Sequence, residues 1–175
     1  MKLAKRVSDI SESVTIAITS KAKKMAKEGI DVVSFAAGEP DFDTPEHIKH
    51  AAIKAINDGF TKYTPSSGML ELREAISKKF KKDNGLEYSP SQIVVSNGAK
   101  HSLANIFEAL CESGDEVLIP SPYWLSYPAM VNIAEAKNVF ITTEQKNGFK
   151  LTEQELESKI SKKTKCLVLN SPSNI

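Results

Sequence analysis

Three short segments of the sequence carry residue types that could bind an anionic or planar ligand. They are segments 96–102, 120–128 and 170–174, and each directly follows a short apolar run. Apolar runs of this length are typical of buried parallel strands, whose carboxyl ends form the ligand-binding edge of open α/β sheets. The sequence therefore predicts a site built from loops at one edge of a sheet.

The first segment places Gly98 immediately before a helical pattern. Gly98 permits a tight turn, and Ala99 and Lys100 would present free N–H groups at the helix start, an arrangement that suits a phosphate or another anion. The segment has neither the P-loop spacing nor the three-glycine dinucleotide fingerprint. Strand–glycine–helix junctions are also common without any ligand, so the segment alone leaves both interpretations open.

The other two segments offer an aromatic ring and an amide. Trp124 is the only tryptophan in the chain and lies among prolines and tyrosines. Its flat side chain could stack on a planar ring, or it could fill the core. Asn174 carries both a donor and an acceptor, which suits a phenolic or carboxylate oxygen, although turns also favour asparagine.

The second half of the chain has the pattern of an α/β fold. Four short apolar runs occur at 93–95, 117–119, 139–141 and 166–169, and helical patterns separate them. Strands alternating with helices predict βαβ units and a mostly parallel sheet covered by helices on both faces.

The first half of the chain is predicted to be mainly helical. A basic amphipathic helix is expected over 16–27 and a short strand over 32–35. A further helix is expected to begin with Thr44 as N-cap and Pro45 as its first residue, and another follows Gly68.

Composition narrows the class of protein. The 175 residues carry a net charge of +1 and 41% hydrophobic residues, which gives no indication of a nucleic-acid or membrane partner. No run reaches the ~20 apolar residues of a membrane span. Cys111 and Cys166 have no metal-like or redox-like spacing, so we expect a cytoplasmic protein without structural disulfides.

Other candidate ligands are weak. His47 and His50 are three residues apart in a predicted helix, but no third metal ligand is apparent. The acidic cluster formed by Glu39, Asp41 and Asp43 lacks a calcium-loop pattern. No metal site is predicted, and His101 has no assigned role.

Five ordered motifs together resemble the class I aminotransferases that depend on pyridoxal phosphate (PLP). These motifs lie at 37–45, at 62–64, at Gly68 with 72–73, at 121–124 and at 170–174. The similarity is greatest to the bacterial aspartate aminotransferase branch and extends from about residue 13 to the last residues. It implies part of a fold type I PLP-dependent transferase, mostly a parallel sheet with flanking helices plus an N-terminal arm. Residues 1–45 would form the arm and part of the small domain, and residues 46–175 the first part of the large cofactor-binding domain.

The resemblance implies a PLP site at the three segments. Ala99 and Lys100 would donate backbone N–H groups to the cofactor phosphate. Trp124 would stack on the pyridine ring, and Asn174 would hydrogen-bond its phenolic oxygen. Trp124 and Asn174 would also lie against the substrate.

The resemblance further implies a homodimer with shared sites. Gly38 would lie against the substrate carboxylate, where a side chain would block its approach. Tyr63 would reach the phosphate in the neighbouring subunit's site. The segment 13–16 resembles the arm that packs on the partner.

The implied reaction moves an amino group between L-aspartate, or a related amino acid, and 2-oxoglutarate. In the family, the Schiff-base lysine, the acidic partner of the ring nitrogen and the carboxylate-binding arginine all lie beyond the position of residue 175. No residue of this chain is therefore predicted to be catalytic, and residues 1–175 are expected to be inactive alone. The family's asparagine loop continues with Pro-Thr-Gly, whereas Asn174 is followed by Ile175.

Three alternatives remain open from the sequence. The chain could belong to another PLP enzyme of the same fold, such as a prephenate or aromatic transferase or a C–S lyase. It could be a non-catalytic truncated paralogue or fragment. It could also be an unrelated α/β phosphate binder that uses only the Gly98 turn.

Overall fold

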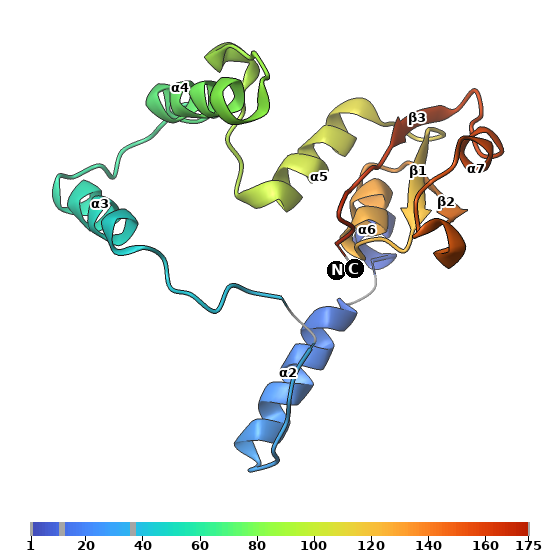
Figure 1. The fold of residues 1–175 in the computed structure, drawn as a ribbon, viewed down its shortest axis with the longest axis horizontal. Helices are drawn as coiled ribbons and strands as arrows, with labels where there is room; N and C mark the ends of the chain where they lie inside the picture. Colours follow the sequence, from blue (N-terminus) through green and yellow to red (C-terminus); the bar gives the residue numbers. More distant parts are fainter. Residues whose placement is uncertain (1, 11–12, 36–37, 175) are drawn as a thin grey trace. The chain divides into compact units, whose positions relative to one another are not determined.

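In the computed structural model, three of the four apolar runs form one parallel sheet (Figure 1). The strands are β1 (Glu116–Ser121), β2 (Lys137–Thr142) and β3 (Thr164–Leu167), in the order β2-β1-β3. The side chains of residues 117–119 in the central strand have no exposed surface. A continuously apolar run is thus buried on both faces, which confirms the predicted parallel α/β arrangement.

The structure describes residues 2–10, 13–35 and 38–174, which form two units. One unit contains Met1–Ser13 and Asn97–Ile175, and the other is Val14–Ser96. The predicted domain boundary near residue 45 concerns the complete protein and stays a prediction.

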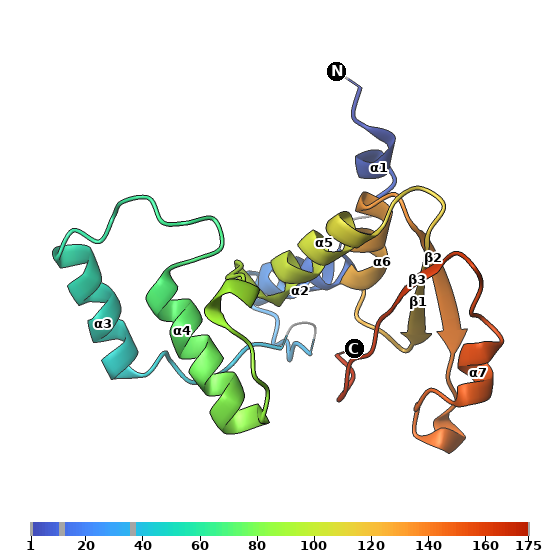
Figure 2. The ribbon, with the colours of Figure 1, turned by 90° about the horizontal axis from the view of Figure 1, so that it is seen from above.

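Helices cover both faces of the sheet in the first unit. Its helical segments are α1 (Lys5–Ser8), α5 (Gly98–Leu110), α6 (Ser126–Ile133), the 3₁₀ turn η3 (Gln145–Asn147) and α7 (Glu153–Glu157). Helix α6 connects β1 to β2, whereas α7 lies on the connection that returns from β2 past β1 to β3. Parallel crossovers are right-handed, so connections running in opposite directions place their helices on opposite faces. Figure 2 shows α5 and α6 on one side of the strands and α7 on the other.

The hydrophobic core lies between β1 and the helices α5 and α6. Val117 and Ile119 point into this layer, and Leu118 faces the opposite side because side chains alternate along a strand. The helices α5 and α6, together with the residues that directly follow them, contribute Phe107, Cys111, Tyr127, Met130, Val131, Ala134 and Ala136 to the same cluster.

Glu116 joins the amino ends of all three strands. Its carboxylate accepts hydrogen bonds from Ser161 Oγ at 2.7 Å and from Lys137 Nζ at 3.1 Å. Its backbone N–H donates to the carbonyl of Lys163 at 2.8 Å. The Ser161 hydroxyl and then the Lys137 ammonium hold the pKa of the Glu116 carboxyl below its ordinary value.

The second unit is helical. It contains α2 (Val14–Lys27), α3 (Glu46–Asn57), α4 (Leu70–Lys79), the π-helical turn η1 (Phe80–Asn84) and the 3₁₀ turn η2 (Pro90–Gln92). Ile93 is its only buried residue in the part of the chain that the structure describes. Many large apolar side chains of this unit, including Ile53, Ile56 and Phe60, are exposed.

Gly68 is the centre of a close backbone contact in this unit. It has a φ of +97°, and a Cβ placed on it would lie 2.5 Å from Val95 Cγ2. The Val95 N–H donates to the carbonyl of Ser67 at 2.9 Å. The Arg73 guanidinium donates to the carbonyl of Gly68 at 3.1 Å and to that of Pro90 at 3.0 Å. The motif that joins Gly68 to Arg73 therefore has a structural role.

Two predicted strands are wrong. The run 93–95 forms no strand, although Ile93 has extended backbone. The Val95 N–H donates to the carbonyl of the loop residue Ser67, and Val94 is exposed. The run 32–35 is likewise irregular, with Val33 and Phe35 exposed. Neither run has a neighbouring strand, within the described ranges, to complete a hydrogen-bonded ladder.

The predicted start of the helix near residue 45 is wrong by one residue. Pro45, rather than Thr44, occupies the N-cap position of α3, with extended backbone at ψ 140°. The Pro45 carbonyl accepts hydrogen bonds from the N–H groups of Ile48 and Lys49 at 2.9 and 3.2 Å.

We expect Gly68→Ala to destabilise the Val14–Ser96 unit more than Gly59→Ala. Both glycines have positive φ, so both substitutions carry the left-handed penalty of about 1–2 kcal/mol. Only the new Cβ at Gly68 meets a neighbour within 4 Å, and this overpacking should add about 1–3 kcal/mol. Urea unfolding followed by circular dichroism measures the difference; equal losses for the two variants would contradict the contact.

Candidate functional site

The strand order reverses at β1, and the loops that follow β1 and β3 lie side by side at this point. The hydroxyl of Ser173 donates to the carbonyl of Pro122 at 3.2 Å, which joins the two loops. The carboxyl ends of strands at such a reversal form the ligand-binding crevice of open α/β sheets. Two of the three segments singled out from the sequence therefore meet.

The start of α5 has free space and uncapped N–H groups, the features that suit an anion. Gly98 has a φ of +80°, and a Cβ there would meet nothing within 4 Å. The helix has no acidic residue in its first turn, and the Asn97 side chain does not cap it. The first N–H groups of a helix have no partner within the helix, so those of Ala99 and Lys100 point outward, available to an anion. Both residues are exposed.

His101, which has no assigned role from sequence, contributes to this turn. Its Nδ1 accepts a hydrogen bond from the backbone N–H of Asn97 at 3.2 Å. This contact requires an unprotonated Nδ1 and helps to fix the backbone just before Gly98.

Trp124 both packs on the core and faces the α5 start. The half-buried indole lies against the core cluster, with the ring of Tyr127 edge-on at 5.4 Å. The ammonium of Lys100 lies 4.9 Å from the Trp124 ring centroid, in a cation–π contact. The structure thus brings together residues predicted from two separate segments, and it shows that Trp124 packs on the core. The stacking of Trp124 on a planar ligand stays a prediction.

The remaining predicted residues are exposed. Asn174 lies in the loop after β3, next to Ser173. Gly38 and Tyr63 belong to the Val14–Ser96 unit, and both are open to solvent. Ala37 of the Gly38 motif lies outside the described residues, as does Ile175.

A cleft of about 610 Å³ lies at the carboxyl ends of all three strands. Its walls include Tyr123, Ser173 and the segment 148–151, which follows β2. This third wall was not predicted, although the same rule about strand ends applies to the run 139–141. Lys150 adds a cation to this wall, and Phe149 adds an apolar surface.

Thr143 fixes the β2 end of this cleft. Its side chain is buried, with 6% exposed, and its hydroxyl donates to the carbonyl of Ser121. The Ser121 hydroxyl in turn donates to the carbonyl of Ile141 at 3.2 Å. These bonds hold the ends of β1 and β2 together where the loops begin.

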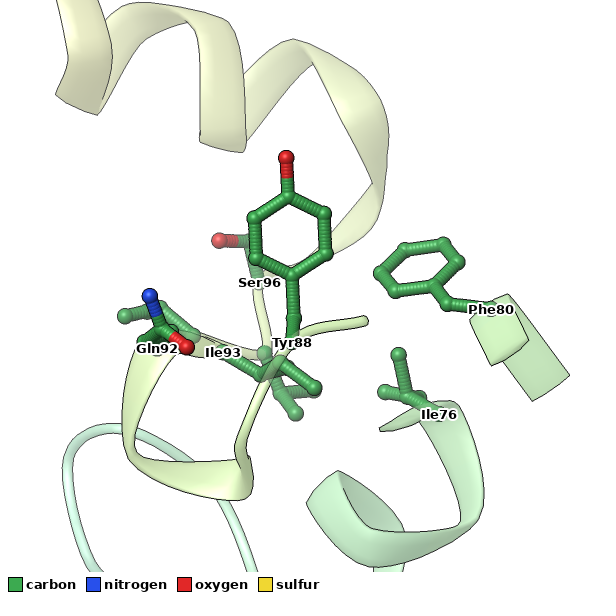
Figure 3. Close-up of a pocket in the computed structure, with 8 residues that line it drawn as sticks. Ile76, Phe80, Tyr88, Gln92, Ile93 and Ser96 are labelled. Carbon is green, nitrogen blue, oxygen red and sulfur yellow. The ribbon is translucent and has the colours of Figure 1, made fainter. Parts of the chain in front are cut away.

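A second hollow of about 470 Å³ lies within the Val14–Ser96 unit (Figure 3). Ile76, Ile93 and the rings of Phe80 and Tyr88 form an apolar wall, and the two rings meet edge-on at 6.1 Å. Gln92 and Ser96 are among the polar residues at its margin. The lining carries no charged side chain, so we assign no chemistry to it.

The described residues contain neither a candidate metal cluster nor a candidate membrane helix. No group of three potential metal-ligating side chains occurs among the described residues, and His47 and His50 are both exposed. The helices of the described ranges are all too short or too polar to cross a bilayer.

Comparison with known proteins gives consistent matches along the whole chain. The family profile described as "Aminotransferase class I and II" matches residues 30–175. The aspartate aminotransferase of Bacillus subtilis (strain 168) is 51% identical over 174 residues, which is 99% of this chain and 44% of the relative. The aspartate/prephenate aminotransferase of Nitrosomonas europaea is also 51% identical, with the same coverage.

Solved structures agree with this match. Aspartate aminotransferase from Thermus thermophilus with maleate superposes with a TM-score of 0.96 at 44% identity, over 99% of this chain and 46% of that one. The enzyme from Rhizobium meliloti gives 0.93 at 47% identity, over 99% and 44%. The chain thus spans less than half the length of the curated relatives it matches.

We expect Thr143→Val to lower the free energy of unfolding by about 1–3 kcal/mol, because the isosteric change removes a buried hydrogen bond to Ser121. The neighbouring Thr142 is exposed, so Thr142→Val is the matched control and should change stability by less than about 0.5 kcal/mol. Chemical denaturation measures both values. Equal effects at the two positions would show that the hydroxyl of Thr143 does not hold the strand ends together.

Proposed function

Because the chain belongs to the class I and II aminotransferase family, we propose that its site serves the transfer of an amino group between L-aspartate and 2-oxoglutarate, with PLP as cofactor. The observation that carries the proposal is the contact between the α5 start and Trp124, which places an anion-binding turn beside an aromatic ring. PLP combines a phosphate with a planar pyridine ring, and these are the two groups that such a pair could bind.

The residues of this chain fit PLP in three respects. The open space around Gly98 and the outward N–H groups of Ala99 and Lys100 suit its phosphate. The half-buried indole of Trp124 suits the pyridine ring of PLP. The Lys100 ammonium lies over the indole, so the pyridine ring would either displace this ammonium or stack beside it. Asn174 has an exposed amide that can bind the phenolic oxygen. When bound, the cofactor supplies a ring that accepts the electron pair released at the substrate α-carbon.

Residues of the Val14–Ser96 unit would complete the site in a homodimer. Gly38 has no side chain and would leave room for the substrate carboxylate. Tyr63 is fully exposed, so its phenol is available to the phosphate in the partner's site. We assign segment 13–16 to the arm on the partner, residues 1–45 to the arm and small domain, and residues 46–175 to the large domain. The free Cys111 and Cys166 support a reducing compartment such as the cytoplasm.

The choice of aspartate is supported by the relatives. Those from Bacillus subtilis and Geobacillus stearothermophilus are named aspartate aminotransferases, and the Thermus thermophilus structure is described with maleate, a dicarboxylate. A prephenate-directed transferase is the second candidate, because relatives from Nitrosomonas europaea and Petunia hybrida carry prephenate in their names.

We expect PLP to quench the fluorescence of Trp124, the only tryptophan, in a saturable titration of residues 1–175. Pyridoxal lacks the phosphate and should bind at least about tenfold more weakly, a difference of about 1.4 kcal/mol. Lys100→Gln keeps its backbone N–H and should retain this preference for the phosphorylated form to within about threefold. Loss of the preference in Lys100→Gln would show that the side chain, not the backbone, binds the phosphate. Equal binding of PLP and pyridoxal by the unmodified chain would refute the proposed turn.

Residues 1–175 alone should show little or no transamination between L-aspartate and 2-oxoglutarate. We assign the α-proton transfer to no side chain of this chain, and a well-placed acid or base contributes about 10²–10⁴-fold to a rate. A coupled assay for oxaloacetate, with the Bacillus subtilis relative as positive control, measures the turnover. Measurable PLP-dependent activity of the purified chain would contradict the assignment.

A further inference from the structure

The fold brings together two cysteines that are distant in the sequence. Cys111 is the C-cap residue of α5, and Cys166 lies in β3. Both carry free thiols. Neither residue takes part in the proposed aminotransferase site, so their proximity needs a separate explanation.

The strand register places both cysteines on the same side of the sheet. Cys166 is aligned with Val117 of β1, and aligned residues of neighbouring strands face the same side. Val117 points into the core cluster beneath α5 and α6, and Cys111 is a buried member of that cluster. Cys166 packs against the same cluster, and it lies close enough to Cys111 to raise the pKa of the Cys111 thiol.

The two thiols differ in accessibility. Cys111 is only 8% exposed, whereas Cys166 is half-buried. Burial is the main cause that raises the pKa of the Cys111 thiol to about 11, and the neighbouring Cys166 raises it further. A reagent in solvent therefore reacts first with Cys166. Cys111 stays a protonated thiol until the Cys166 sulfur is part of a mixed disulfide.

We propose that Cys111 and Cys166 form a reversible intramolecular disulfide when the protein meets a small-molecule disulfide as oxidant. The Cys166 sulfur attacks the small disulfide, loses its proton to solvent and releases one small thiol, which leaves a mixed disulfide on Cys166. The Cys111 sulfur then attacks the Cys166 sulfur, the bond between Cys166 and the small sulfur breaks, and the departing thiolate takes the proton that Cys111 loses and leaves as the second small thiol. The two protein thiols are thereby oxidised, and one small disulfide is reduced to two thiols.

The cross-link would join the C-terminal end of α5 to β3, two elements that carry the candidate site. Helix α5 begins at the Gly98 turn and ends at Cys111, and β3 continues into the loop that contains Asn174. A disulfide between them stabilises the folded state mainly by restricting the unfolded chain. Oxidation should therefore raise the unfolding midpoint of the native chain.

The test is to incubate native residues 1–175 with oxidised glutathione and map the products by mass spectrometry without reduction. We expect loss of two hydrogen atoms, a peptide pair joining Cys111 to Cys166, and reversal by dithiothreitol. Cys111→Ser should instead stop at a glutathione adduct on Cys166. Cys166→Ser should leave Cys111 unmodified in the native state and reactive only in denaturant.

Three outcomes would overturn the proposal, and each is measured on the chain without substitutions. One is a native chain that ends with separate glutathione adducts on both cysteines. Another is a chain that cross-links between molecules. A third is a chain that stays reduced at an oxidant excess that modifies the denatured protein. The denatured sample shows that the reagent works, so the result does not depend on whether the serine variants fold.

Discussion

The burial of β1 is the constraint on which the rest of the Asn97–Ile175 unit depends. Residues 117–119 lose all of their exposed surface, and each such side chain contributes about 1.5–3 kcal/mol on burial. Because Val117 and Ile119 face α5 and α6 while Leu118 faces the opposite side, a slip of one residue would exchange the two faces and disrupt the packing on each. The register fixed in this way sets where the strands end, and so where the loops with Trp124 and Asn174 begin.

Much of this sheet could be predicted from the sequence, because a central parallel strand is apolar on both faces and its pattern is visible without tertiary information. The same pattern was misleading at 93–95 and 32–35. An apolar run becomes a strand only when a neighbour supplies the other half of its hydrogen bonds, and that neighbour is not encoded in the run itself. The one-residue error at Thr44 has a local cause, since proline is favoured as the first residue of a helix, whereas Pro45 lies one position before it.

The candidate site was predictable in its parts but not in its contacts. The Gly98 turn, Trp124 and Asn174 follow from the rule about strand ends, yet the cation–π contact between Lys100 and Trp124 depends on how α5 packs against the β1 loop. Thr143 was missed because a threonine after a strand is unremarkable until its burial is known. Gly68 and Arg73 contribute to the family resemblance, and the structure gives them a role in joining backbone segments rather than in chemistry.

Glu116 lies at the end of the sheet opposite the candidate site. Its bonds to Ser161, Lys137 and Lys163 hold the three strands at their amino ends, and the bonds of Thr143 and Ser121 hold β1 and β2 at their carboxyl ends. The loops of the candidate site therefore leave a sheet that hydrogen bonds hold at both of its ends. Over evolution, the recognition loops of such a chain can exchange residues and alter substrate preference while the framework beneath them keeps its geometry.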